Sequence, residues 1–287
     1  MGEALNRAVK RLKQKGAETP RLDAEVLLAH VLEQERVYLY RESLRLLDQV
    51  SASRYNQLLM RRAAGEPVAY LTGHKEFMGF DFLVGPHVLI PRPETELLVE
   101  QALDLLHQWP DPAPVVVDVG TGSGAVAVSL ARLAPDCVVY ATDISAAALA
   151  LARENSGRQG VTLHFAQGDL LAPLGEMLRP GTAALIAANL PYIPAGELPG
   201  LPRPVRDFEP RLALDGGPDG LDLYRRLAPQ ALALLAGGGH LLMEISPAQS
   251  GAMRRLLDEA LWETDILKDL AGMPRLTVAR KRRGAPE

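Results

Sequence analysis

The sequence contains very little cysteine, because Cys137 is the only one among 287 residues. A single thiol excludes an intrachain disulfide, which fits a reducing compartment such as the cytoplasm. Since Cys137 lies in the apolar run CVVYATD, we expect a buried strand cysteine rather than a nucleophile. The six histidines are scattered and form no cluster with cysteine, so we expect no metal site.

An excess of basic residues is also missing. The chain has 31 Lys and Arg against 35 Asp and Glu, and this balance argues against a protein that lives on bare nucleic acid. No uninterrupted apolar run approaches the roughly 20 residues of a membrane span, and the first residues lack the apolar core of a signal peptide. We therefore expect a cytoplasmic monomer with no direct nucleic-acid or membrane partner.

The composition that remains is that of a globular protein. Hydrophobic residues make up 47% and charged residues 23%, so the chain can bury a sizeable core in one large or two modest domains. Residues 1–66 show only helical patterns. Thr19 and Pro20 are typical of a helix start, and Ser51 precedes an apolar stripe that ends at Gly65. We predict a small helical N-terminal domain over residues 1–66.

The pattern changes at residue 67 and again at about residue 93. Between residues 67 and 92, glycines and prolines punctuate short apolar runs such as DFLV and HVLI, which predicts a β-hairpin linker. From 93 to 287, apolar strand patterns alternate with helical ones. The predicted strands are PVVVDVG, CVVYATD, VTLHFAQGD, TAALIAAN, GHLLMEI and RLTVARK. This alternation predicts an α/β domain with a mostly parallel sheet and helices on both faces.

The segment VVVDVGTGSGAVAV joins the first of these strands to a helix. Gly120, Gly122 and Gly124 allow the backbone to turn sharply and to approach a ligand closely. With Ala125 the loop also satisfies the GxGxxG/A dinucleotide fingerprint, so its spacing leaves both a nicotinamide dinucleotide and S-adenosylmethionine open. Asp118 stands just ahead of the loop, where a carboxylate suits a cationic sulfonium better than a pyrophosphate.

Four polar residues stand at the ends of predicted strands, namely Asp118, Asp143, Asp169 and Asn189. The carboxyl ends of parallel strands share one edge of a sheet, and ligands of open α/β sheets bind there. Asp143 lies close to the ~20 residues beyond the loop at which a carboxylate accepts from ribose hydroxyls. The sequence therefore predicts a site for a ribose-bearing ligand at this edge.

The stretch AANLPYIP ends the strand TAALIAAN. Pro191 cannot donate to a strand ladder, so Asn189 and Tyr192 would stand at the exit of the strand. The side-chain oxygen of Asn189 can accept one N–H of a planar NH2 group, and the carbonyl of Leu190 can accept the other. Two such acceptors would position and desolvate the nitrogen, while Tyr192 stacks on the flat group. An amide and an aromatic amine both remain open as acceptors of a methyl group.

Several blocks of the sequence resemble the HemK/PrmC family of peptide chain release factor glutamine methyltransferases. The blocks are HVLIPRPETE, VVDVGTGSGAVAV, ATDIS, NLPYIP, FEPRLALDGGPDGLDLYRRL and LAGMPRLTVAR. The resemblance implies a class I S-adenosylmethionine-dependent methyltransferase domain with a Rossmann-like fold over residues 93–287. It also implies a helical N-terminal domain that recognises the protein substrate. The implied activity is N5-methylation of the glutamine in the GGQ motif of class 1 release factors.

The resemblance also implies roles for individual residues. It places S-adenosylmethionine against Gly120, Thr121, Gly122, Ser123, Gly124, Asp143, Asp169, Leu170 and Asn189. Among these, Gly120 to Gly124 would surround the methionine part, Asp143 would bind the ribose hydroxyls, and Asp169 and Leu170 would lie by the adenine. Asn189, Leu190, Pro191 and Tyr192 would hold the glutamine, with Asn189, Pro191 and Tyr192 as the catalytic group.

Two departures from the family pattern affect these expectations. The family motif is NPPY, whereas Leu190 replaces the first proline here, and NLPY is also typical of rRNA adenine N6-dimethyltransferases. The family's Glu-x-Gly becomes Glu244, Ile245, Ser246 and Pro247. The alternative function is an N6-adenine methyltransferase acting on RNA or DNA, which would place a flipped base in the same loop. A cofactor-binding regulatory protein without turnover and a nicotinamide oxidoreductase are further alternatives.

Overall fold

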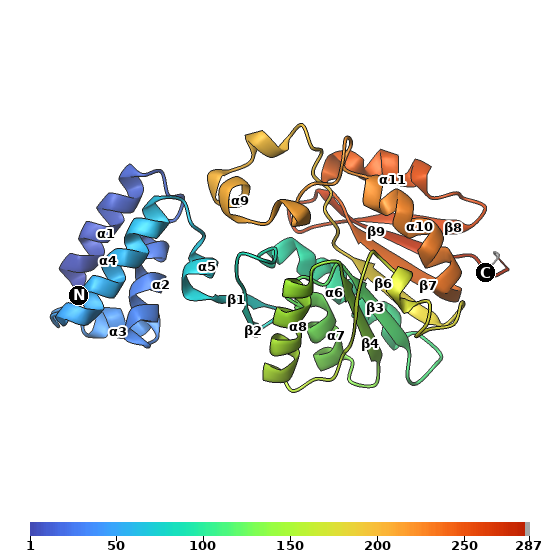
Figure 1. Ribbon diagram of the computed structural model, residues 1–287, viewed down its shortest axis with the longest axis horizontal. Coiled ribbons are helices and arrows are strands. Elements are labelled where there is room, and N and C mark those ends of the chain that lie inside the picture. Colours follow the sequence, from blue (N-terminus) through green and yellow to red (C-terminus); the bar gives the residue numbers. More distant parts are fainter. Residues whose placement is uncertain (285–287) are drawn as a thin grey trace. The chain divides into compact units, whose positions relative to one another are not determined.

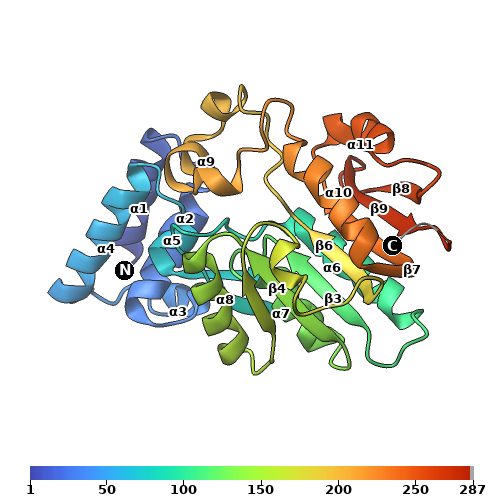
Figure 2. The ribbon, with the colours of Figure 1, turned by 45° about the vertical axis from the view of Figure 1, so that its right-hand side comes forward.

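The computed structural model describes residues 1–284, which divide into two compact units (Figures 1 and 2). The first unit comprises Met1–His74 together with Leu201–Phe208. The second comprises Lys75–Gly200 and the chain from Glu209 on. No helix of the described part is long and apolar enough to cross a membrane.

The first unit is entirely helical. Its helices are α1 (Gly2–Gln14), α2 (Pro20–Leu32), α3 (Arg36–Arg41), α4 (Gln49–Ala63), α5 (Val68–Thr72) and α9 (Arg203–Phe208). Asp48 caps α4, since its side chain accepts a hydrogen bond of 2.9 Å from the backbone N–H of Ser51. Short helices are marginal alone, and the apolar stripes of α1, α2 and α4 form one core. That core includes Leu5, Leu12, Leu27, Leu28, Tyr55 and Leu59.

The segment predicted as a hairpin linker contains a shorter hairpin than expected. Residues Val68–Thr72 form helix α5, and the hairpin consists of β1 (His74–Phe77) and β2 (Phe80–Leu83). Met78 and Gly79 form its turn with φ angles of 52° and 77°, the positive values that two-residue hairpin turns require. The run HVLI at residues 87–90 is not a strand, and it lies beside the cavity described below.

A seven-stranded sheet forms the centre of the second unit. Its strands are β3 (Val115–Val119), β4 (Val138–Asp143), β5 (His164–Gln167), β6 (Ala183–Ala188), β7 (Leu235–Glu244), β8 (Trp262–Lys268) and β9 (Pro274–Lys281). Their order is β5-β4-β3-β6-β7-β9-β8. The first five strands of this order pair in parallel, while β9 pairs antiparallel with β7 and with β8. The sequence did not predict β8, an edge strand in which polar and apolar residues mix.

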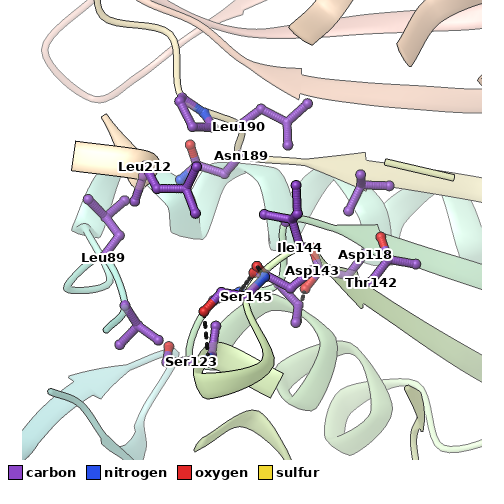
Figure 3. A pocket seen from close by; sticks show the side chains of 18 of the residues that line it. Leu89, Asp118, Ser123, Thr142, Asp143, Ile144, Ser145, Asn189, Leu190 and Leu212 are labelled. Carbon is purple, nitrogen blue, oxygen red and sulfur yellow. Dashed lines mark hydrogen bonds between the residues drawn. The ribbon is translucent and has the colours of Figure 1, made fainter. Parts of the chain in front are cut away.

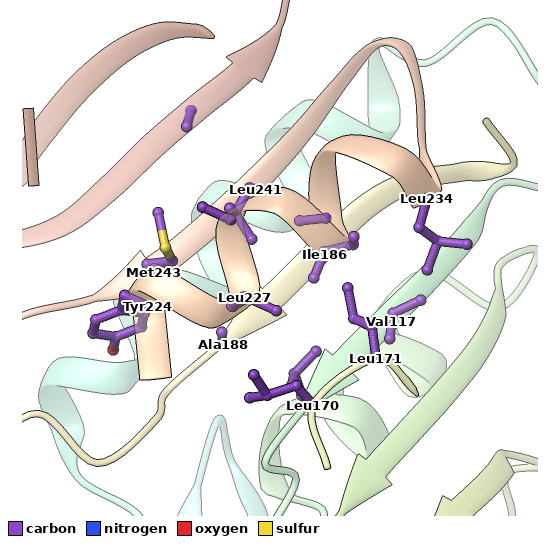
Figure 4. Packing of buried hydrophobic residues seen from close by; sticks show 14 of the residues in the cluster. Val117, Leu170, Leu171, Ile186, Ala188, Tyr224, Leu227, Leu234, Leu241 and Met243 are labelled. Carbon is purple, nitrogen blue, oxygen red and sulfur yellow. The ribbon is translucent and has the colours of Figure 1, made fainter. Parts of the chain in front are cut away.

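Helices cover both faces of the sheet. Helices α6 (Glu96–His107), α7 (Ala125–Leu133) and α8 (Ala146–Arg158) lie on one face, and α10 (Asp222–Leu234) and α11 (Ser250–Leu256) lie on the other (Figure 1). Successive strand residues pack on opposite faces: Val117 joins the core under α10, whereas Val116 joins the core under α6 and α7. Figure 4 shows Tyr224 of α10 beside Met243 of β7, and Leu227 further along α10 toward Ile186 of β6. The near-continuous apolar strands follow from this double coverage.

The strand register brings the predicted site residues to one edge of the sheet. Val119, the last residue of β3, is aligned with Thr142 and with Ala188, and Ala188 is aligned with Met243. The residues that follow, including Asp143 and Asn189, therefore emerge together at the carboxyl ends of the central strands.

Candidate active site

A cavity of about 450 Å³ lies at this edge of the sheet (Figure 3). The predicted site residues that line it are Gly120, Thr121, Gly122, Ser123, Asp143, Asp169, Leu170, Asn189, Leu190 and Pro191. Two predicted residues, Gly124 and Tyr192, lie outside the lining. Asn189 and Leu212 lie across the cavity from Ser123 and Ser145 in Figure 3. A cavity of this size accommodates a small organic ligand.

The glycine loop has the backbone conformation that its composition predicts. Gly120, Gly122 and Gly124 have φ angles of 73°, 57° and 81°, which side-chain-bearing residues rarely adopt. A Cβ atom on Gly120 would lie 2.8 Å from Cδ2 of Leu190, and one on Gly124 would lie 3.2 Å from Cα of Ala152 in α8. Gly124 thus serves close packing of the loop against α8, while Gly120 and Gly122 face the cavity.

Asp143 holds the glycine loop and the start of α8 at the same time. Its Oδ2 accepts a hydrogen bond of 2.9 Å from the N–H of Gly122, and its Oδ1 accepts one of 2.8 Å from the N–H of Ser145. Burial raises the pKa of this carboxyl, and the backbone donors oppose the rise. Each carboxylate oxygen retains a further lone pair, so Asp143 can accept from a pair of hydroxyl groups in the cavity.

Asp118 is the most deeply buried acid of the cavity, with 2% of its surface exposed. Its Oδ2 accepts from the hydroxyl of Thr121 at 2.6 Å and from the N–H of Ala127 at 3.2 Å. Burial raises the pKa of Asp118 to about 7, although both hydrogen bonds act against the rise. The nearby carboxylate of Asp143 raises it further. A cation in the cavity would favour the ionised form.

The charges of the lining fit a cationic ligand and not a pyrophosphate. Three carboxyls, those of Asp118, Asp143 and Asp169, face the cavity. In the described chain the only Lys or Arg of the lining is Arg226, which is paired with Asp169. A phosphate group would meet these acids without a free cation. The sulfonium, the ammonium and the ribose hydroxyls of S-adenosylmethionine match both the carboxylates and the close backbone of the glycine loop.

Asn189 is held by Thr95, a residue for which the sequence predicted no role in the site. Its Nδ2 donates to Oγ1 of Thr95 at 3.0 Å, and the hydroxyl of Thr95 donates to Oε2 of Glu244 at 2.7 Å. Thr95 and Glu244 are 4% and 2% exposed. The register of β6 and β7, which places Asn189 and Glu244 at neighbouring strand ends, is the signal that could have linked this pair. Thr95 comes from the start of α6, and no sequence signal linked it to them.

Tyr192 was expected to stack on the substrate, but it lies outside the lining of the cavity. Its side chain is mostly buried, and its hydroxyl donates to Oε1 of Glu244 at 3.3 Å. Burial, together with Glu244, raises the pKa of Tyr192 above its ordinary value. Behind it, the hydroxyl of Tyr224 donates to the backbone carbonyl of Glu244 and lies 3.5 Å from the carbonyl of Leu190. Both tyrosines therefore buttress the strand ends.

The segment DGGPDG supports the loop that follows Asn189. The N–H of Gly216 donates to the carbonyl of Ile193 at 2.9 Å, and the N–H of Ala195 donates to Gly217 at 2.8 Å. A Cβ on Gly220 would lie 2.1 Å from the carbonyl oxygen of Tyr192. The glycines are thus required because the two backbones lie in direct contact.

The Ser246-Pro247 departure also has a structural explanation. Ser246 and Gln249 form a capping box, in which each side chain bonds the backbone of the other residue. Gln249 is thereby placed so that its Nε2 donates to the carbonyl of Tyr192 at 2.8 Å. The two residues that depart from the family pattern therefore begin a turn that braces the same loop.

Two segments beside the cavity are joined by a buried acid. Glu209 pairs with Arg92, and its Oε2 accepts from the N–H of Ile90 at 3.3 Å. Its neighbours at residues 210, 212 and 213 line the cavity, as do residues 86–89 and 91. The blocks HVLIPRPETE and FEPRLALDGG, far apart in sequence, therefore meet at one site.

Comparisons with known proteins agree with this geometry. Residues 3–73 match a family model described as "PrmC N-terminal domain", and residues 116–201 match one described as "Methyltransferase domain". The chain is similar to a methyltransferase structure from Pyrococcus furiosus, with a TM-score of 0.51, 16% identity, and coverage of 80% of this chain and 99% of that one. The fold and the site define a class I S-adenosylmethionine-dependent methyltransferase.

Curated relatives give the particular family. A release factor glutamine methyltransferase of Moorella thermoacetica is 48% identical over 98% of both chains. Another, of Nitratidesulfovibrio vulgaris, is 42% identical over 96% of this chain and 94% of that protein, and one of Deinococcus radiodurans is 38% identical over 98% and 99%. The chain belongs to the family of release factor glutamine methyltransferases.

Proposed function

We propose that the protein methylates the side-chain amide nitrogen of the glutamine in the GGQ motif of class 1 peptide chain release factors. When bound, S-adenosylmethionine would supply the methyl group from its sulfonium to the amide nitrogen and would leave as the neutral thioether, while the nitrogen gives up one proton that finally passes to the solvent. Family membership supports the substrate, and the arrangement around Asn189 supports the chemistry.

One observation carries the proposal most directly. The Nδ2 of Asn189 is engaged by Thr95, which leaves Oδ1 to accept from a ligand in the cavity. The Leu190 carbonyl, one peptide bond further on, is the second proposed acceptor. An NH2 group held by both would be stripped of water and oriented, so the enzyme's contribution is mainly positioning. An amide nitrogen needs this help because its lone pair is delocalised.

The roles proposed for the other residues follow their positions in the cavity. We assign Gly120, Thr121, Gly122 and Ser123 to the methionine part of the cofactor and Asp143 to the ribose hydroxyls, while Gly124, which lies outside the lining, supports the loop by packing against α8. Asp169 and Leu170 are assigned to the adenine. Pro191 lines the cavity and stiffens the loop. Tyr192 is assigned a supporting role through Glu244, in place of the stacking role that the sequence suggested.

The helical domain is proposed to hold the protein substrate, since the methyltransferase unit carries the cavity by itself. Release factors act in translation, so the proposed location is the cytoplasm. We propose that the chain works as a monomer.

A methyl-transfer assay with radiolabelled S-adenosylmethionine tests the function. The acceptors are a purified release factor, its GGQ Gln→Ala variant and rRNA, offered side by side. Label on the wild-type factor alone is the expected result. Label on rRNA would instead assign the protein to the adenine N6-methyltransferases, whose NLPY motif it shares.

A further inference from the structure

The buried chain from Glu244 through Thr95 to Asn189 has a direction. An ionised carboxylate accepts hydrogen bonds and donates none, so the hydroxyl of Thr95 must donate to Glu244. The oxygen of Thr95 is then left as an acceptor toward Asn189, which meets it with the Nδ2 donor at 3.0 Å. The oxygen and the nitrogen of an asparagine amide are nearly identical in shape, and only their partners decide which way the amide faces.

We propose that Thr95 and Glu244 are positioning residues that hold the amide of Asn189 with its oxygen toward the substrate, and that this orientation selects glutamine over glutamate. The inference rests on the proposed function and deepens it. A glutamine offers N–H donors to the Asn189 oxygen and to the Leu190 carbonyl. A glutamate carboxylate would place its own acceptor oxygens against these two acceptors and would find no donor. A site without water strongly rejects a group whose polar atoms are left unpaired in this way.

A flipped Asn189 would reverse this selectivity. Its oxygen would face the oxygen of Thr95, whose only proton is already committed to Glu244. Its Nδ2 would face the cavity and repel the N–H groups of a glutamine. Because the side chains of Thr95 and Glu244 are buried, water cannot take the place of a lost hydrogen bond, and a flipped Asn189 would leave polar atoms unpaired.

The orientation depends on the ionised form of Glu244. The groups that face this carboxyl are the hydroxyls of Thr95 and Tyr192, the guanidinium of Arg275 on β9 and the carboxyl of Glu94. Burial raises the pKa of Glu244, Glu94 raises it further, and the other three groups oppose the rise. Once protonated, Glu244 can donate to Thr95, which then can donate to a flipped Asn189. Activity should therefore fall on the acid side, at pH values above the ordinary range of a glutamate.

The test compares three threonine variants of the enzyme, with the intact release factor as substrate. Thr95→Val removes the hydroxyl at nearly constant shape, and we expect kcat to fall by about 10- to 100-fold while the dissociation constant of S-adenosylmethionine stays the same. Thr95→Ser restores the hydroxyl and should recover most of kcat. Thr277→Val is the matched control, because Thr277 is fully buried in β9 and its hydroxyl has no partner within the described residues.

A double-mutant cycle separates positioning from general damage. If Thr95 acts through Asn189, Thr95→Val should cost nothing further in the Asn189→Ala background, whereas a merely structural role would add its full cost. Glu244→Gln keeps the shape of the side chain but cannot titrate, so the loss of kcat that we expect for the wild-type chain at acid pH should be absent from this variant. Measuring the melting temperature of each variant checks that it is folded.

The outcomes distinguish the inference from the function on which it rests. A wild-type chain that labels no release factor would overturn both. Label on the wild-type factor together with a fully active Thr95→Val variant, or with an additive cycle, would overturn the inference alone. A release factor whose GGQ glutamine is replaced by glutamate should accept no label, and label at that carboxylate would equally contradict it.

Discussion

Under the proposed function, single residues at the strand ends divide the cavity into a cofactor side and an acceptor side. Asp143 belongs to the first, with both carboxylate oxygens already bonded to the backbone of Gly122 and Ser145. Asn189 belongs to the second, with its donor end turned to Thr95. The two residues can therefore be tested independently, because Asp143 is proposed to act on the cofactor and Asn189 on the glutamine.

Asp143→Ala is expected to weaken cofactor binding before it affects catalysis at saturation. Loss of charged acceptors for the ribose hydroxyls should raise the dissociation constant of S-adenosylmethionine by about 10- to 100-fold. Isothermal titration calorimetry measures this directly. An unchanged dissociation constant would remove Asp143 from the cofactor site.

Asp118 makes stability depend on pH. Its pKa is about 7 in the folded protein and near 3.8 when unfolded, so the folded state holds the proton more tightly. The folded state therefore loses stability as pH rises from about 4 to about 7. Asp118→Asn removes this loss while its oxygen still accepts from Thr121. As pH rises from 5 to 8, the free energy of unfolding of the variant should rise relative to that of the wild type by on the order of 2 kcal/mol, which corresponds to about 5 °C in melting temperature.

Thermal unfolding of both chains at the two pH values provides the measurement. If the melting temperatures of the variant and the wild type changed equally with pH, folding would not raise the pKa of Asp118 as this account requires.

The sequence predicted which residues stand at the strand ends but not all of their contacts. Glycine spacing, strand patterns and family resemblance placed Asp143 and Asn189 in one site, because parallel strands share an edge. The position of Tyr192 and the role of Thr95 were not predictable in this way. Both depend on side-chain directions and on a contact between residues 94 positions apart.

At the scale of elements, the loop after β6 is held by backbone contact with the segment DGGPDG. Gly220→Ala places a Cβ 2.1 Å from the carbonyl of Tyr192, at a φ angle of 78°. Gly160→Ala is the matched control, since Gly160 has a φ angle of 68° and nothing within 4 Å of the added atom. The control should cost about 1 kcal/mol for its backbone conformation alone.

Gly220→Ala should cost clearly more, about 3 kcal/mol or above, because the loop must also move. It should lower methyl transfer as well, whereas the control should not. Denaturant unfolding and the methyl-transfer assay check both parts. Equal costs for the two variants would show that the loop yields without strain.

Element prediction was most accurate where patterns were strongly periodic or wholly apolar. The central strands β3, β4 and β6 were predicted within a few residues. Strand β8 was missed because it lies at the sheet edge, where three of its seven residues are exposed and its pattern is weak. The run HVLI was predicted as a strand since its residues are apolar, but they lie beside the cavity instead of pairing.

At the scale of the whole molecule, exposed apolar side chains are concentrated in the helical unit. Among the described residues, those with large exposed hydrophobic side chains in residues 1–74 are Leu22, Val37, Tyr40, Leu44, Leu46, Val50 and Met60. These are seven of the thirteen in the described chain, although residues 1–74 are about a quarter of its length. Leu44 and Leu46, two positions apart and 95% and 88% exposed, are the most exposed of the seven, which makes them the first candidates for the substrate-holding role proposed for this domain.

Replacing Leu44 and Leu46 by serine should therefore raise the KM for an intact release factor by about 10-fold, at unchanged kcat. A short GGQ peptide, which lacks the rest of the factor that the helical domain is proposed to hold, should be methylated equally by the variant and the wild type. Leu270→Ser is the control, since Leu270 is fully exposed in the methyltransferase unit. An equal KM for the factor in all three chains would refute a substrate-holding role for this part of the helical domain.

The central claim is that the main role of Asn189 is to hold the glutamine, so that its side chain contributes little to the affinity for the cofactor. The most direct measurement compares Asn189→Ala with the wild type in two ways, by the mass of the GGQ peptide after reaction with release factor and by calorimetric affinity for S-adenosylmethionine. We predict at least about 100-fold slower appearance of the mass of one methyl group, with cofactor affinity changed less than about twofold. Normal methylation, or loss of cofactor affinity in parallel with activity, would contradict the account.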